Sequence, residues 1–212
     1  MTDSYWQSHL FWGSHAPLAS LTSLGLLVMA SGRTAFAIVA GGALIWVYGW
    51  TVLVAGFGKP ILPQKGRALV FVFLSSFFGS LYLMLLYFIN PFLAMESTFL
   101  VMLASLSCIS GEICRRVDAL DPEESISRAV LEALVLALLL IALALIREPL
   151  GFGSLSVPGG PQGIIELFSI DGGVYFPVQI IAGSAGAFLL LGYGLALFHH
   201  FRKRFIRTED SP

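Results

Sequence analysis

The run SLSCISGEICRR holds both cysteines of the chain, Cys108 and Cys114. Thiolates are soft ligands that suit zinc and iron–sulfur clusters, and a closed site of this kind needs four ligands. Four histidines lie near the expected ends of the membrane-spanning helices and not beside the cysteines: His9, His15, His199 and His200. Cys108 therefore either shares a metal site with another subunit or is a small buried hydrophobe. Cys114, beside Arg115 and Arg116, is either a reactive thiol or an idle one at a membrane interface.

Carboxylates are the second group of side chains that could do chemistry. Glu112 lies one helical turn beyond Cys108, and Glu96 and Glu132 lie near the ends of apolar segments. An ionisable residue inside a membrane is a candidate for proton or ion relay. These three glutamates lie close to an interface, where water can solvate their carboxylates. We therefore do not expect them to form a relay.

A basic and an acidic residue stand side by side at the end of the fifth apolar segment, in Arg147-Glu148-Pro149. Proline lacks a backbone N–H and disfavours the helical conformation in the residue before it. We therefore expect the helix to end here, with a local ion pair between the two charged side chains.

The chain that must position these side chains is strongly apolar. Of its 212 residues, 57% are hydrophobic and 12% are charged, whereas soluble domains carry about 25% charged residues. A soluble fold of this size cannot bury so much apolar surface, so we expect an all-α integral membrane protein with a single membrane domain over residues 1–212. The sequence contains no phosphate-binding loop, dinucleotide fingerprint or hydrolase motif, and a nucleic-acid partner is not expected.

Six apolar segments can be read along the chain: residues 17–30, 34–57, 68–89, 92–111, 129–146 and 176–199. Crossing the hydrocarbon core takes about 20 residues of helix, a length that segments two to six reach or nearly reach. The first segment is too short for an ordinary span, so we expect a broken or half-depth helix there. The Gly- and Pro-rich stretch 148–175 should form a structured cap outside the membrane and not a helix.

Basic residues set the expected orientation. With both termini in the cytoplasm, the cytoplasmic loops hold ten of the twelve Lys and Arg residues: Lys59, Lys65, Arg67, Arg115, Arg116, Arg128, Arg202, Lys203, Arg204 and Arg207. The outer side then holds only Arg33 and Arg147. Because cytoplasmic loops are enriched in Lys and Arg, we expect a multi-pass protein of the bacterial cytoplasmic (inner) membrane with both termini inside. The basic tail HHFRKRFIR would then contact anionic membrane lipid.

Three spans followed by three spans place the two halves, about 10–90 and 91–205, in opposite orientations, which is the geometry of an inverted repeat. The halves share a short pattern, because SLGLLVMASGR resembles SLSCISGEICR, and this alignment sets Cys108 opposite Leu26, one residue before Leu27. Both stretches are rich in small residues that let helix backbones approach closely. We therefore expect six transmembrane helices as an inverted 3+3 repeat, with helices 1 and 4 short or broken.

Three stretches also resemble a known family of membrane proteins: LFWGSHAPLASLTSLGLL (10–27), SLSCISGEICRR (105–116) and IREPLGFGSL (146–155). They are similar to the membrane subunits of the Rnf electron-transport complex and of the sodium-translocating NADH:quinone reductase (Nqr), and closest to the E-type chain of Rnf and the D-type chain of Nqr. The third stretch is the most specific, because it is close to the family's Arg-Glu-x-x-Gly-x-Gly-x-Leu. Length and number of spans extend the resemblance over the whole chain.

This resemblance implies that the chain is one subunit of a redox-driven, ion-translocating complex, together with a homologous subunit of inverted topology and further redox subunits. In the family, each of the two homologous chains supplies one cysteine from its first helix and one from its fourth. The four thiolates hold a [2Fe–2S] cluster at the middle of the membrane. The electron flow through the complex is coupled to translocation of Na⁺ or H⁺.

The sequence departs from the family pattern at these ligand positions. The first ligand position is Leu27, followed by Val28 in place of proline, and only Cys108 remains as an expected ligand of a shared [2Fe–2S] cluster. The spacing from Cys108 to Gly111 is one residue shorter than in the family, and an alignment on Gly111 places Ser107 at the ligand position. Leucine cannot bind iron, so the subunit either relays electrons with a different ligand set or acts as a scaffold.

The alternative from another functional class is a stand-alone inverted-repeat transporter of a small solute, with its substrate site between broken helices. Such a transporter of charged solutes should carry buried charge at the middle of the membrane. A third hypothesis is an assembly factor without a transport role.

Overall fold

The computed structural model of the chain describes residues 24–59, 66–110, 122–169, 179–194 and 196. Within these ranges, four helices are long and apolar enough to cross a membrane: α4 (Thr34–Gly58), α5 (Arg67–Ile89), α6 (Pro91–Ser110) and α8 (Pro122–Phe152). Even the shortest, α6 with 20 residues, is about 30 Å long, which matches the hydrocarbon core. The chain is therefore a multi-pass helical membrane protein. The limits predicted for the second, third and fourth segments are confirmed to within one residue.

Helix α8 extends beyond both ends of the fifth predicted segment, 129–146. It was expected to end at Arg147-Glu148-Pro149, but it continues through Pro149 to Phe152. Proline removes one hydrogen bond of the helix, and the ladder resumes behind it, because the Gly153 N–H donates to the Pro149 carbonyl oxygen at 3.0 Å. The helix stops only at Gly153, whose φ of 67° lies in the left-handed region that favours glycine.

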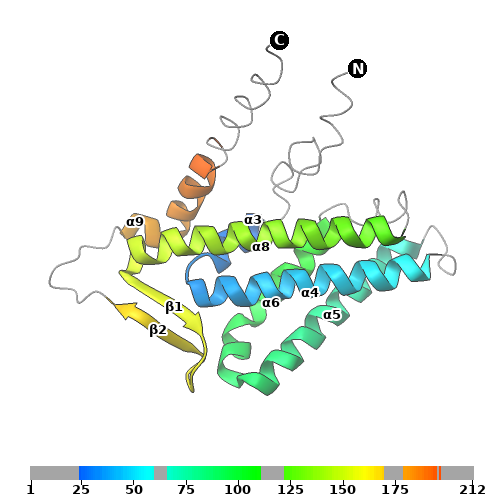
Figure 1. Cartoon of the computed structure of the whole chain (residues 1–212), viewed down its shortest axis with the longest axis horizontal. Coiled ribbons are helices and arrows are strands. Elements are labelled where there is room, and N and C mark those ends of the chain that lie inside the picture. Colours follow the sequence, from blue (N-terminus) through cyan, green and yellow to red (C-terminus); the bar gives the residue numbers. More distant parts are fainter. Residues whose placement is uncertain (1–23, 60–65, 111–121, 170–178, 195, 197–212) are drawn as a thin grey trace, which may run out of the picture.

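Helices α4 and α8 form an antiparallel pair at the centre of the molecule (Figure 1). Two contacts give their register: a Cβ on Gly41 would lie 3.2 Å from the Ala137 Cβ, and one on Gly49 would lie 3.8 Å from a Val130 methyl. The absence of a side chain at both glycines lets the two backbones approach closely, as is common between membrane helices. Buried residues of α4, α6 and α8 meet around this pair.

Helices α5 and α6 are joined at Asn90, which lies between them. Its side-chain oxygen accepts a hydrogen bond from the Leu93 N–H at 3.1 Å, and its side-chain nitrogen donates to the Gly160 carbonyl oxygen at 2.8 Å. The first bond caps the start of α6. The second ties the α5–α6 connection to the segment that follows α8, so both lie at the same end of the bundle.

That segment is a β-hairpin, β1 (Ser154–Pro158) and β2 (Ile164–Ser169), paired antiparallel with an irregularity between Leu155 and Ser156. The stretch was expected to be a structured cap without helix, and residues 148–152 instead complete α8 while 154–169 form the hairpin. The described fold is thus that of a helical membrane protein with one small hairpin added at one end. Turn residues Gly160 and Gly163 have φ values of 73° and 87°, which side chains rarely allow.

Three short helices complete the described fold. Helix α3 (Leu24–Ala30) has seven residues and is separated from α4 by a turn, while residues 17–23 of the first predicted segment lie outside the described ranges. Helix α9 (Gln179–Ala182) is separated at Gly183 from an apolar helix, Ser184–Gly194. The fourth segment, expected to be short or broken, is a continuous helix in its described residues. The break appears in the sixth segment.

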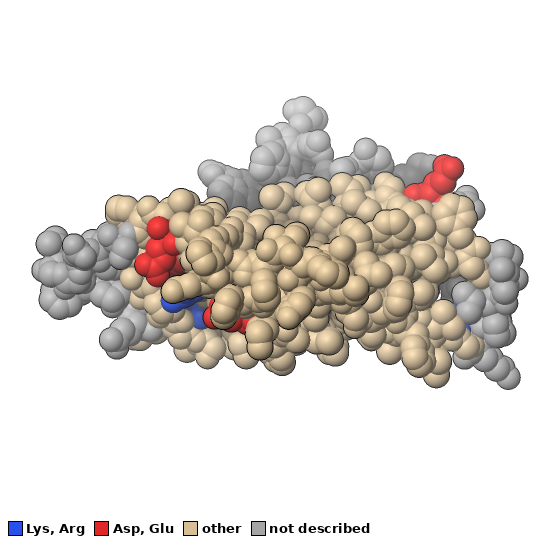
Figure 2. Space-filling model, turned by 90° about the horizontal axis from the view of Figure 1, so that it is seen from below, with Lys and Arg blue, Asp and Glu red and all other residues tan. Residues whose placement is uncertain are grey.

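Charged and apolar surfaces are separated along the bundle. Figure 2 shows acidic and basic side chains near the two ends, with an uncharged belt between them on this face. Large apolar side chains are exposed along α5 and α6: Phe73, Phe77, Met84, Phe88, Phe92, Phe99 and Leu106. In a membrane, lipid tails solvate these side chains, so their exposure needs no protein partner.

Candidate functional site

Arg147 is a buried cation near the end of α8, with only 5% of its surface exposed. Its Nη1 donates to the Val28 carbonyl oxygen at 2.8 Å and to the Ser31 hydroxyl oxygen at 2.9 Å. Val28 belongs to the last turn of α3, where backbone carbonyls have no partner within the helix and carry partial negative charge. The guanidinium therefore caps the carboxyl end of α3.

The same guanidinium binds a second helix end. Its Nε donates to the Ile181 carbonyl oxygen at 3.0 Å, and its Nη2 donates to the carbonyl oxygens of Ala182 and Gly183 at 2.8 and 3.0 Å. These carbonyls close α9 at the break in the sixth segment. Arginine carries five N–H donors in a planar fork, and all five are used. One side chain thus holds two interrupted segments that are far apart in the sequence.

Glu148 is fully buried and binds the opposite kind of helix end. Its Oε2 accepts a hydrogen bond from the Thr34 N–H at 2.6 Å, at the start of α4. The amino end of a helix carries partial positive charge, so the carboxylate is stabilised there. Beside it, the Ser156 hydroxyl oxygen of β1 accepts from the Ala35 N–H at 3.4 Å.

The predicted local ion pair between Arg147 and Glu148 is therefore wrong as a description of this site. Neighbouring side chains on a helix point about 100° apart, so the two charges face different elements. Each charge is instead matched by helix ends of the opposite partial charge. We call Arg147, Glu148 and the helix ends that they bind the charge junction.

Two glycines of the same stretch have positions at which a larger residue would clash or strain the backbone. A Cβ on Gly151 would lie 2.9 Å from the Ala182 Cα, so α8 and α9 touch there. Gly153 provides the left-handed turn from α8 into β1. The stretch IREPLGFGSL thus supplies both charges of the junction, one close helix contact and one chain reversal.

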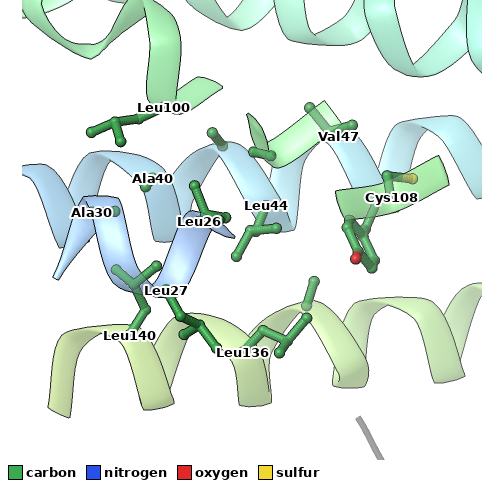
Figure 3. Close-up of a cluster of buried hydrophobic side chains, with 14 of the residues drawn as sticks. Leu26, Leu27, Ala30, Ala40, Leu44, Val47, Leu100, Cys108, Leu136 and Leu140 are labelled. Atoms are coloured by element: carbon green, nitrogen blue, oxygen red, sulfur yellow. The ribbon is translucent and has the colours of Figure 1, made fainter. Parts of the chain in front are cut away.

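Cys108 lies in the interior of the bundle and is fully buried. Its thiol is close to the hydroxyl of Thr51, although that hydroxyl has no hydrogen bond of good geometry in the described part of the chain. Figure 3 shows Cys108 beside Val47, within the apolar core. Cys114, Arg115 and Arg116 lie outside the described residues.

Leu27, the predicted counterpart of Cys108, is also in the core, on α3. In Figure 3 the two residues lie at different levels of the bundle, with Leu44 between them, and Leu27 is beside Leu140. Helix α3 therefore presents leucines to the core at the position where the resembling family has a cysteine. The expected pairing of Leu27 and Cys108 as ligand positions does not correspond to a direct contact.

A [2Fe–2S] cluster shared with another subunit requires that its ligands reach a subunit boundary. Cys108 has no exposed surface, and its neighbours are side chains of its own chain. Among the residues that the structure describes, no group of three or more His, Cys, Asp or Glu could hold a metal ion. The described residues therefore give Cys108 no second metal ligand, and the shared [2Fe–2S] cluster stays a prediction.

The three glutamates considered as relay candidates have different surroundings. Glu132 is only 4% exposed, so the expectation that it is solvated is wrong. It lies on the face of α8 that packs into the bundle, a property that its place in the sequence, near the segment end, did not reveal. Glu96 is exposed on α6, and Glu112 lies outside the described residues.

Polar residues whose mutual contact was not predicted share the interior with Glu132. Thr51 is fully buried on α4, and the Tyr48 hydroxyl of the same helix lies 3.4 Å from the Ser107 hydroxyl oxygen of α6, within hydrogen-bond distance. Tyr48 and Thr51 are three residues apart, a spacing that places them on one helix face. That spacing inside an apolar segment was the signal that could have identified them.

No protein-family model matches the sequence, and no curated protein matches it either.

Proposed function

We propose that the chain is a membrane subunit of a redox-driven, ion-translocating electron-transport complex of the Rnf/Nqr type, in which it acts as a scaffold. The observation that carries this proposal is the charge junction. The stretch with the most specific resemblance, IREPLGFGSL, is the stretch that joins α3, α4, α8, α9 and the hairpin through Arg147, Glu148, Gly151 and Gly153. A motif in which four of the five matched residues have their own structural task is a better sign of common architecture than composition alone.

The proposed architecture is six spans in two inverted halves, about 10–90 and 91–205. In this arrangement α4 and α8 are the second helices of the two halves, and their central antiparallel packing supports the relation. The start of α4, the α5–α6 connection and the hairpin share one end of the bundle, as alternate crossings require. The two predicted outer arginines, Arg33 and Arg147, belong to this end, so the proposed orientation keeps both termini in the cytoplasm of a bacterial cell.

The scaffold version follows from the core around Cys108. Leu27 and Cys108 are both buried in the single chain, and the described residues hold one cysteine and therefore no thiolate pair for electron relay. The partners in this proposal are a homologous subunit of inverted topology, the redox subunits of the complex and membrane lipid.

The test is to purify a tagged full-length chain from its native membrane under mild detergent and to identify the co-purifying proteins by mass spectrometry. Flavin-carrying and ferredoxin-like subunits in stoichiometric amounts are the expected result. A chain that purifies alone or with unrelated proteins contradicts the proposal. Iron content and electron paramagnetic resonance of the complex then check the scaffold role, because a replacement of Cys108 by serine should leave both unchanged.

A junction variant links this test to the structure. Arg147→Lys keeps the charge but loses the five-donor fork, so it should reduce incorporation of the chain into the complex. Arg128→Lys is the matched control, because Arg128 is exposed and binds only Glu124 in its own helix among the described partners.

A stand-alone transporter of a small charged solute is the second candidate, and the buried Glu132 favours it. Buried charge was the feature expected to distinguish this class. Flux of ions or charged solutes into liposomes that contain only this chain would favour the transporter over the scaffold.

A further inference from the structure

We propose that the hairpin of β1 and β2 lies in the headgroup region of the leaflet around the start of α4, where exposed apolar side chains of β2 contact lipid chains. These side chains are Ile165, Leu167 and Phe168, which we call the apolar patch of β2. The inference goes beyond the scaffold role proposed above, because it depends only on the described helices crossing a membrane. Its test uses the chain alone, so membership in a complex does not affect the result.

The hairpin rests on the bundle through one of its two faces. The Ser156 hydroxyl oxygen accepts a hydrogen bond from the Ala35 N–H of α4 at 3.4 Å, and Ile164 packs against apolar residues of three helices. Successive residues of a strand point to opposite faces, and cross-strand partners share a face. Ser156 pairs with Glu166, and Pro158 pairs with Ile164, so these residues belong to the face on the bundle side.

The apolar patch of β2 is exposed in the single chain. Ile165 pairs with Val157, so both lie on the face that points away from the bundle. Leu167, which has no cross-strand partner in the register, is 63% exposed, and Phe168 is exposed as well. A sheet face in contact with water is normally polar. The composition of this patch therefore indicates apolar surroundings.

The depth of the hairpin follows from its contacts with the helices. A Cβ on Gly163 would lie 3.0 Å from the Leu93 backbone nitrogen, so the turn of the hairpin touches the first turn of α6. Ile164 packs against the cluster that contains Val39 of α4 and Leu86 of α5. The start of β2 therefore lies beside the ends of these helices and not beyond them, at the end of the bundle seen in Figure 1.

The α5–α6 connection extends the lipid-facing surface to the same level. Phe88, Ile89 and Phe92 flank this connection, and all three are exposed. Asn90 between them donates to the Gly160 carbonyl oxygen in the turn of the hairpin at 2.8 Å. Lipid that solvates the connection therefore also reaches the hairpin, and the apolar patch of β2 continues the lipid-facing surface of α5 and α6.

The backbone of the hairpin limits how deep it can lie. β1 and β2 form a two-stranded sheet, so β2 has a second edge without a strand partner in the described part of the chain. A lipid-exposed sheet edge does not occur in the hydrocarbon region, because its N–H and C=O groups find no partner there. Water and headgroups can bind such an edge in the interface, while apolar side chains reach the acyl chains. The hairpin therefore lies in the interface.

The hairpin offers lipid an apolar contact and not an electrostatic one. Glu166 is the only charged residue between Ser154 and Ser169, and this stretch contains no basic residue. Anionic headgroups attract segments with several basic residues, so they add nothing to the binding of this hairpin. Its partner is therefore the boundary between headgroups and acyl chains, and a bilayer without net charge should be sufficient.

The experiment places one nitroxide spin label on the hairpin of the full-length chain in phosphatidylcholine liposomes. A background with Cys108→Ala and Cys114→Ser receives Leu167→Cys as its single thiol. Oxygen concentrates in lipid and a nickel chelate stays in water, so the ratio of their collision rates with the label reports its surroundings. We expect a ratio severalfold above that of Glu123→Cys, the aqueous reference in the first turn of α8, and below that of Phe99→Cys, the lipid reference on α6.

Glu166→Cys is the matched control, because it carries the label on the neighbouring residue at the bundle side of the hairpin. Its ratio should be closer to the aqueous reference. The proposal is overturned if position 167 gives the aqueous ratio or the same ratio as position 166. Low collision rates with both reagents also overturn it, because protein then covers the patch, and dipolar broadening between labels would identify a second copy of this chain. If Leu167→Cys does not fold, Ile165→Cys decides the question by the same criteria.

Discussion

The guanidinium of Arg147 lies 2.8 Å from the carbonyl oxygen of Val28, a residue 119 positions earlier in the chain. Three more of its hydrogen bonds reach residues 181–183. The two interrupted segments of the protein are therefore joined through one side chain, and the next residue, Glu148, holds the start of α4. The stability of the bundle should depend on this junction more than on any single apolar contact.

The first prediction concerns Arg147→Lys. Lysine has three donors on one nitrogen, so at least two of the five acceptors lose their partner in a buried place. We expect a loss of about 2–4 kcal/mol in the free energy of unfolding. Thermal unfolding in detergent, followed by tryptophan fluorescence, measures it. Arg128→Lys should change the transition by less than about 0.5 kcal/mol, because exposed ion pairs contribute little; equal effects of the two variants would contradict the role of the junction.

The second prediction uses two glycines with opposite surroundings. Alanine at Gly151 would place its Cβ 2.9 Å from the Ala182 Cα, so Gly151→Ala should destabilise the protein by about 1–3 kcal/mol through overpacking. Alanine at Gly192 meets nothing within 4 Å and improves helix propensity, so Gly192→Ala should be neutral or stabilising by up to about 1 kcal/mol. Parallel unfolding curves check both signs. The close α8–α9 contact would be refuted if Gly151→Ala were as stable as the wild type.

The third prediction concerns Leu27, which the resembling family replaces by a cysteine ligand. Leu27 is packed in the core, so Leu27→Ala should leave a cavity and lower the free energy of unfolding by about 1–3 kcal/mol. This loss is smaller than in a soluble protein, because the unfolded helices of a membrane protein remain in lipid and their apolar side chains are not transferred to water. Leu106→Ala, at a lipid-exposed position of α6, is the control and should have little effect. Chemical unfolding in mixed micelles compares them, and a similar cost at both positions would argue against a core role.

The fourth prediction concerns access to Cys108. A fully buried thiol should not react with a maleimide while the bundle is folded. In a Cys114→Ser background, labelling of the single remaining thiol should be slow in mild detergent and complete after denaturation. Mass spectrometry of the intact chain counts the labels. Rapid labelling of the folded protein would place Cys108 at an accessible surface and would restore the case for a ligand shared with a neighbouring subunit.

Several features of the fold could be predicted from the sequence. Lys59 follows the end of α4, Gly66 precedes the start of α5, and Asn90 separates α5 from α6, so composition alone places these limits. The fifth helix was predicted too short. Its first turns contain Glu123, Glu124 and Arg128, so they are too polar to be recognised as part of an apolar segment. A helix can nevertheless continue beyond the membrane, where it needs no apolar surface. The hairpin was predicted as a cap because its glycines and prolines are visible, whereas its strand pairing depends on a register that they do not encode.

By itself, the sequence determined that this chain belongs in a membrane, because a soluble fold of this size cannot bury so many apolar side chains. The same apolar runs placed most of the helices. Only the tertiary structure decided what the charged residues do. Arg147 and Glu148 looked like neighbours that pair, yet successive side chains of a helix diverge and meet partners far away in the sequence. Glu132 looked like an interfacial acid, yet the rotation of α8 about its axis turns it into the bundle, where it is buried. That rotation is set by the packing of whole helices, which no local pattern contains.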